Sequence, residues 1–156
     1  MGDAMLRKQL SDALKTAMLA KDTRSVSTVR LILAALKDRD IAARPKGQAD
    51  GISNDEILQM LQSMIKQRRE SITMYEQGNR PELAKQEGEE IVIIEKFLPQ
   101  QMDEDQIQAA ISAIIDEIGA GGIKDMGRVM ALLKERHAGQ MDFAKASAAV
   151  KGQLGA

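Results

Sequence analysis

The spacing of apolar residues constrains the fold of this 156-residue sequence more than any other feature, because they recur every third or fourth position along nearly the whole chain. The first such stripe contains Leu6, Leu10, Leu14 and Met18. This spacing places apolar side chains on one face of an α-helix, whereas a half-buried strand would alternate apolar and polar residues. The seven stripes lie within residues 6–18, 26–36, 57–75, 83–98, 107–118, 126–133 and 143–154. The sequence therefore predicts an all-α protein with seven helices and no sheet.

Polar residues at the expected helix starts support these boundaries. The segments Ser53–Glu56 and Asp103–Gln106 have the spacing of a capping box, in which two residues satisfy each other's free backbone N–H groups. Asp125 and Asp142 stand at the expected N-cap positions of the last two helices. The local sequence thus predicts where four of the helices begin.

Pro99 marks the expected domain boundary. A proline disfavours helical backbone angles at the residue before it, here Leu98, and a polar Gln100-Gln101 pair follows. We expect an N-terminal helical domain over residues 1–99 and a C-terminal three-helix domain over residues 100–156. The alternative is one continuous helical bundle.

The scarce residue types exclude several kinds of chemistry. Cysteine is absent, which excludes disulfides, cysteine-bound metals and thiol catalysis. His137 is the single histidine, so a metal site built from several histidines is excluded too. Tryptophan is absent and only three aromatic residues occur, which argues against RNA recognition through stacked bases. We therefore expect no metal and no cofactor.

Charge and hydropathy predict a soluble protein. The net charge of −1 does not describe a globally basic nucleic-acid binder. The first residues lack the apolar run of a signal peptide, and no apolar stretch approaches the 18 residues of a membrane span. The expected location is the cytoplasm, with no membrane partner.

Charged residues fall on two apolar stripes. Arg68 lies on the third stripe, Glu87 lies on the fourth, and Glu90 stands beside it. The short link over residues 78–80 makes the two helices antiparallel neighbours, so these side chains point into one interface. The simplest interpretation is a structural ion pair that fixes the helix register. The alternatives are a carboxylate acid–base pair with an arginine clamp, and a ligand site.

Basic residues also flank the second stripe. Arg30 and Lys37 border it, and Lys66 and Arg69 flank Arg68 on the third stripe. Such residues most often form a solvated face, and the alternative is that they bind phosphates or an acidic partner.

A glycine-rich loop over residues 119–122 precedes the sixth expected helix. It lacks the order of a nucleotide-binding P-loop, yet the free N–H groups of a helix start attract anions. Gly127 allows a backbone to approach closely, and residues 124–151 hold six basic and three acidic residues. The candidate RNA-binding residues are Lys124, Gly127, Arg128, Lys134 and Lys151. The alternative is an ordinary mixed surface.

Taken together, these features resemble the GatB/YqeY family over nearly the whole chain. The matching positions are Asp22, Val29–Leu31, Lys37, Ile65–Ser71, Tyr75, Gly78–Arg80, Glu87, Glu90, Phe97–Gln101, Met126–Met130 and Lys151. The stretch Gly139–Asp142 departs from the family pattern by lacking an arginine. The resemblance implies a helical N-terminal domain followed by a small three-helix domain.

The resemblance also implies a role near tRNA. The same domain is similar to the tail of the GatB subunit of the glutamine-dependent aminoacyl-tRNA amidotransferase, where it contacts tRNA. Its implied partners are tRNA or another structured RNA, together with an amidotransferase or synthetase protein. The family is also associated with carbon–nitrogen ligase activity that uses glutamine as the amido donor.

Three hypotheses follow. The first is a non-catalytic accessory module associated with tRNA or other RNA. The second is a carbon–nitrogen ligase or amidotransferase component, against which stands the lack of an activated nucleophile and of an ATP site in the sequence. The third is a protein-interaction adaptor. We assign no residue a catalytic role.

Overall fold

The computed structural model describes residues 3–155, and within them it contains seven α-helices and no strand. The all-α prediction is therefore confirmed. The helices are α1 Asp3–Leu19, α2 Thr23–Ala43, α3 Asn54–Gln77, α4 Pro81–Glu95, α5 Glu104–Ile118, α6 Met126–Arg136 and α7 Phe143–Gln153. Two short 3₁₀ helices, η1 Arg44–Lys46 and η2 Ile123–Asp125, precede α3 and α6.

The chain separates into two compact units, the first ending at Leu98 and the second beginning at Pro99. Helices α1 to α4 belong to the first unit and α5 to α7 to the second. The expectation of two domains that fold independently, over residues 1–99 and 100–156, stays a prediction.

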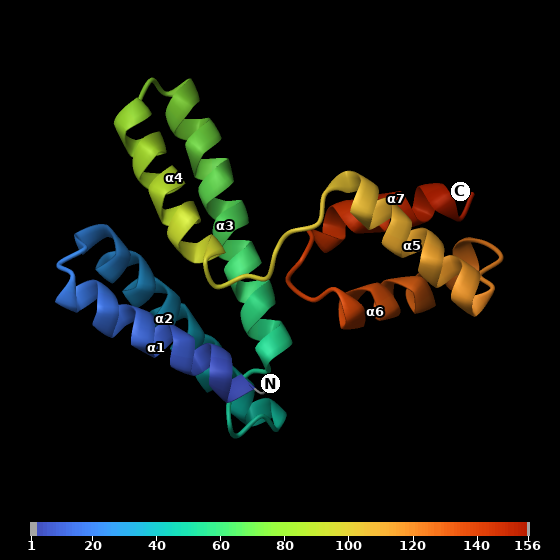
Figure 1. Cartoon of the computed structure of the whole chain (residues 1–156), viewed down its shortest axis with the longest axis horizontal. Coiled ribbons are helices and arrows are strands. Elements are labelled where there is room, and N and C mark those ends of the chain that lie inside the picture. Colours follow the sequence, from blue (N-terminus) through green and yellow to red (C-terminus); the bar gives the residue numbers. More distant parts are fainter. Residues whose placement is uncertain (1–2, 156) are drawn as a thin grey trace. The chain divides into compact units, whose positions relative to one another are not determined.

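The first unit consists of two helical hairpins, α1 with α2 and α3 with α4 (Figure 1). Helix α2 also packs against α4, which joins the hairpins. Fully buried side chains from four helices form the core: Leu10, Ile32, Ile57, Leu61 and Ile94. Burying a side chain of this size contributes about 1.5–3 kcal/mol, so packing between the hairpins outweighs helix propensity in fixing the arrangement.

The end of α1 departs from the predicted apolar stripe. Met18 is 50% exposed, and Ala17 is buried in its place. At 100° per residue, Ala17 lies about 20° from Leu6 around the helix axis, whereas Met18 lies about 120° away. A stripe of strict four-residue steps rotates off the buried face, which explains the difference.

A polar clamp ties the loop before α3 to the first hairpin. Nη1 and Nη2 of Arg7 donate to the two carboxylate oxygens of Asp40 at 2.6 and 2.9 Å. Nη2 of Arg7 also donates to the backbone oxygen of Ile52, and the Ile52 N–H donates to Asp40, both at 2.9 Å. The Arg7 guanidinium, followed by the Ile52 N–H, holds the pKa of Asp40 below its ordinary value.

All four predicted residues occupy N-cap positions, and three of them cap their helices with a side-chain hydrogen bond. Ser53 and Asp103 form the two expected capping boxes with Glu56 and Gln106. Asp142 accepts a hydrogen bond from the N–H of Ala144 at the start of α7. Asp125 is the exception, for a reason given below.

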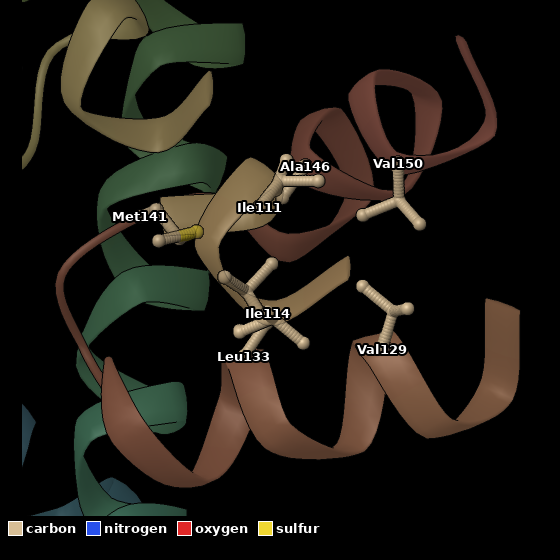
Figure 2. Packing of buried hydrophobic residues seen from close by; sticks show 7 residues of the cluster. All are labelled: Ile111, Ile114, Val129, Leu133, Met141, Ala146 and Val150. Atoms are coloured by element: carbon tan, nitrogen blue, oxygen red, sulfur yellow. The ribbon is translucent and has the colours of Figure 1, made fainter. Parts of the chain in front are cut away.

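The second unit has its own core between α5, α6 and α7. Ile111, Ile114, Val129, Leu133, Met141, Ala146 and Val150 are buried there (Figure 2). The segment after Pro99 is tied to the loop before α7, because Nε2 of Gln101 donates to the Gly139 oxygen at 2.7 Å. The Met102 N–H donates to the Gln140 oxygen at 2.9 Å.

Across residues 3–155, none of the helices is long and apolar enough to span a membrane.

Candidate functional site

The loop before α6 is braced by the carboxylate of Asp125. It accepts hydrogen bonds from the N–H of Gly121 and from Nη2 of Arg128, both at 2.8 Å. The Gly121 N–H first, and Arg128 second, hold the pKa of Asp125 below its ordinary value. Asp125 is the N-cap residue of α6, as predicted, but its side chain forms no cap hydrogen bond because the carboxylate turns back toward the loop.

The first turn of α6 has an open surface at Gly127. A Cβ atom at this position would meet no heavy atom within 4 Å, so packing does not require the glycine. Lys124 and Arg128, on either side of it, are exposed. A phosphate could therefore approach the helix backbone here, with cationic side chains beside it.

The end of α7 lies next to this helix start. The side chains of Val150 on α7 and Val129 on α6 face each other (Figure 2). Lys151 follows Val150 directly and is exposed. Lys134 is exposed too, but it lies seven residues after Gly127, about 10 Å farther along the helix. Four of the five predicted RNA-binding residues thus lie at one end of the second unit, and Lys134 lies apart.

The second unit as a whole is not basic. Its sequence carries six basic and eight acidic residues. Arg136 pairs with Glu117 at 2.7 Å, and Asp125 partly neutralises Arg128. The net charge of the unit therefore does not attract an anion, and any attraction has to come from individual basic side chains.

The stretch Gly139–Asp142 serves packing. Met141 is 2% exposed and belongs to the core of the unit. Gly139 has a positive φ of 76°, which glycine adopts without strain. The backbone oxygens of Gly139 and Gln140 accept the hydrogen bonds described above.

Arg68, Glu87 and Glu90 meet between α3 and α4. Nε of Arg68 lies 2.9 Å from Oε2 of Glu90 and 3.8 Å from Oε2 of Glu87. Nη1 of Arg68 donates to the Met64 oxygen at 3.2 Å. The side chains of Arg68 and Glu90 are only 13% and 9% exposed, so this interaction is shielded from solvent.

Two carboxylates share one guanidinium in this cluster. Burial raises the pKa of Glu87, the hydrogen bond and charge of Glu90 raise it further, and Arg68 opposes them. Such an arrangement fixes the register of the α3–α4 hairpin and favours a proton on Glu87. Across residues 3–155, no three histidine, aspartate or glutamate side chains are grouped to hold a metal ion.

Sequence analysis missed a groove between α1 and α2 with a volume of about 270 Å³. Of its basic residues, only Lys37 was singled out from the sequence; Arg7 and Arg44 also line it. The signal was present in the spacing of Lys37 on α2 and Arg44 at its C-cap, since residues seven apart on a helix lie on the same face.

Comparison with known proteins identifies similar sequences. The family model described as Yqey-like protein matches residues 7–154. The relatives include "Altered inheritance of mitochondria protein 41, mitochondrial" from Lachancea thermotolerans, 32% identical over 111 residues, which is 70% of this chain and 57% of the relative. The protein of the same name from Clavispora lusitaniae is 32% identical over 118 residues, covering 74% and 65% of the two chains. That from Saccharomyces cerevisiae strain YJM789 is 35% identical over 91 residues, covering 58% and 47%.

These relatives correct the expected location of the protein. They carry the word mitochondrial in their names, so the expected cytoplasmic location is wrong. The composition argument failed because solubility does not distinguish between cellular compartments. The matches span between about half and two thirds of the length of each of these relatives.

Proposed function

This chain belongs to the family of YqeY-like proteins, and from that premise we propose that it is a non-catalytic accessory module that binds structured RNA, with tRNA as the first candidate. Family membership fits an accessory module. The proposal adds the ligand and assigns it to the end of the second unit that holds the start of α6.

The open backbone at Gly127 carries the proposal. The N–H of Met126 already donates to the Ile123 oxygen, so a phosphate oxygen would approach the exposed backbone one residue later, at Gly127. Lys124 and Lys151 supply mobile ammonium groups beside it. Arg128 is held by Asp125 at 2.8 Å, so it presents its remaining guanidinium donors in a fixed direction.

The scarcity of aromatic residues favours recognition of the RNA backbone and shape over recognition of splayed bases. With three to four phosphates neutralised, the logarithm of the affinity should fall against the logarithm of salt concentration with a slope of about −3. Binding should therefore be weak at physiological salt.

The experiment measures bulk tRNA binding by electrophoretic mobility shift at two salt concentrations. Lys124→Glu/Lys151→Glu is the test variant, because reversing Arg128 would also disturb the Asp125 brace. Lys66→Glu/Lys85→Glu, on exposed positions of the first unit, is the control with the same change in net charge. We expect the test variant to lose about tenfold or more in affinity and the control to change less than about twofold.

Two results would contradict the proposal. If wild-type protein binds no tRNA at low salt, or if both variants bind equally, the RNA surface is wrong and the adaptor hypothesis gains support. Glutamine hydrolysis or ATP binding by the pure chain would instead contradict the non-catalytic part, in favour of the ligase hypothesis.

A further inference from the structure

A row of basic residues follows the groove between α1 and α2. Arg30 and Lys37 lie on α2, and Arg44 is the C-cap residue of that helix, with helical backbone angles. Their spacing of seven residues places the three within about 40° of one another around the helix axis. All three are exposed, and the latter two line the groove. The row extends over about 21 Å, because each residue of a helix rises about 1.5 Å.

The negative charge in the groove is already compensated. Asp40 is the acidic residue in the lining, and both of its oxygens accept hydrogen bonds from Arg7. The N–H of Ile52 donates to the same carboxylate. The excess positive charge of the groove therefore lies on Lys37 and Arg44.

Aliphatic side chains separate the basic ones. Leu33, Leu36 and Ile41 line the groove, and Ile41 is 47% exposed. A polynucleotide backbone would gain little from covering aliphatic surface, and no aromatic ring lines the groove to stack on a base. An amphipathic helix gains from both features, because its apolar face covers the aliphatic residues while its acidic residues meet the basic row.

We propose that this groove binds an acidic amphipathic helix of a partner protein. The spacing of the basic row matches two helical turns, so acidic residues repeated every seven positions on the partner would face Arg30, Lys37 and Arg44 in turn. The apolar residues between those acidic positions would cover Ile41 and Leu33. The Arg7–Asp40 pair holds the floor of the groove in place before the partner arrives.

The probe is a fluorescently labelled helical peptide of about 18 residues, with leucines on one face and glutamates beside them. We expect binding at low salt with a Kd of about 10–100 µM. The backbone amide NMR signals of groove residues such as Ser11, Leu33 and Ile41 should shift on titration. A peptide with alanines in place of the leucines should bind at least about fivefold more weakly.

Reversing the charges of the groove, and then those of the peptide, tests whether the two are electrostatically complementary. This design predicts a gain of binding as well as a loss. Lys37→Glu/Arg44→Glu should weaken binding by about tenfold or more, while Lys66→Glu/Lys85→Glu should change it by less than about twofold. The reversed variant should in turn bind a peptide whose glutamates are replaced by lysines. That gain would show that the variant is folded and that charge determines the choice of partner.

Three results would overturn the proposal. One is equal peptide binding by wild type and by the Lys37→Glu/Arg44→Glu variant. Another is tRNA binding that this variant loses while the peptide does not bind, which would assign the groove to RNA. The third is concentration-dependent dimerisation that the same variant abolishes, since the occupant would then be a second copy of this chain.

Discussion

The Arg7–Asp40–Ile52 clamp shows what single residues contribute that local sequence does not reveal. The capping boxes at Ser53 and Asp103 join residues three positions apart, so the sequence predicts them directly. The clamp joins Arg7 to Asp40, 33 positions later, and to Ile52, 45 positions later. Nothing in the local sequence pattern pairs these residues. The local pattern therefore predicted these two capping boxes but not the clamp.

Gly51 supports the clamp through its lack of a side chain. Its φ is +95°, and a Cβ atom there would lie 2.7 Å from Nη2 of Arg7 and closer still to Oδ1 of Asp40. Gly51→Ala should lower the free energy of unfolding by about 3 kcal/mol, from backbone strain and displacement of the clamp. The measurement is urea unfolding followed by circular dichroism.

Gly47→Ala is the matched control. Gly47 has a φ of +93° but open space around the Cβ position, so its substitution adds backbone strain alone. Its cost should be about 1 kcal/mol. Equal costs for the two variants would show that the clamp contributes nothing to stability.

At the scale of elements, apolar spacing predicts the helices because burial of one face determines them. It does not predict the charged cluster between α3 and α4 in detail. The positions of Arg68 and Glu87 on facing stripes, with Glu90 beside them, predict that the three side chains lie close together. That Arg68 lies nearer to Glu90 than to Glu87 depends on how the hairpin packs.

Arg68→Ala should destabilise the protein far more than Arg69→Ala. Removing Arg68 leaves two shielded carboxylates without their cation, at a cost of about 2–4 kcal/mol. The Arg69 side chain is 67% exposed, and its Nη2 lies 3.6 Å from Oε1 of Glu95. Its removal should therefore lower the free energy of unfolding by less than about 1 kcal/mol. Thermal melts of the two variants give the comparison, and equal melting temperatures would rule out a buried role for Arg68.

The Glu87–Glu90 pair should make the hairpin more stable in mild acid. Because the folded-state pKa of Glu87 is raised above its ordinary value of 4.5, the folded protein holds a proton that the unfolded chain releases. This contribution is present below pH 4.5 and is lost as the pH rises through the folded-state pKa. Asp40 and Asp125, whose pKa values are lowered, act in the opposite direction.

Glu87→Gln isolates this contribution. A neutral amide imitates the protonated carboxyl, so the variant should melt at a higher temperature than wild type at pH 7. The difference should shrink as the pH falls toward 4.5. Glu76→Gln, on an exposed position of α3, should show no such convergence. A pH-independent difference for Glu87→Gln would contradict a shifted pKa.

At the scale of the whole molecule, charge divides unevenly between the two units. The sequence to residue 98 carries 16 basic and 15 acidic residues, and the remainder carries six and eight. The two proposed binding surfaces are consequently local patches within nearly balanced surroundings. The sequence predicted the C-terminal patch from its glycine-rich loop, but not the groove, since Arg7 and Lys37 come from different helices.

The second unit should fold when expressed alone as residues 99–156. It has a separate core from all three of its helices, and the segment after Pro99 is hydrogen-bonded within the unit. A domain of this size is marginally stable, so we expect cooperative unfolding at a low melting temperature. The free energy of unfolding should be about 2–5 kcal/mol at 25 °C. Calorimetry of this fragment is the test, and a fragment without a cooperative transition would contradict the two-domain prediction.

The lack of space for a side chain at Gly51 has a consequence for how the sequence evolves. No side chain fits at position 51 while Arg7 and Asp40 remain paired beside it. A lineage that loses Arg7 or Asp40 also loses the steric constraint that keeps position 51 free of a side chain. Among homologous sequences, positions 7, 40 and 51 should therefore covary: they are conserved together or substituted together.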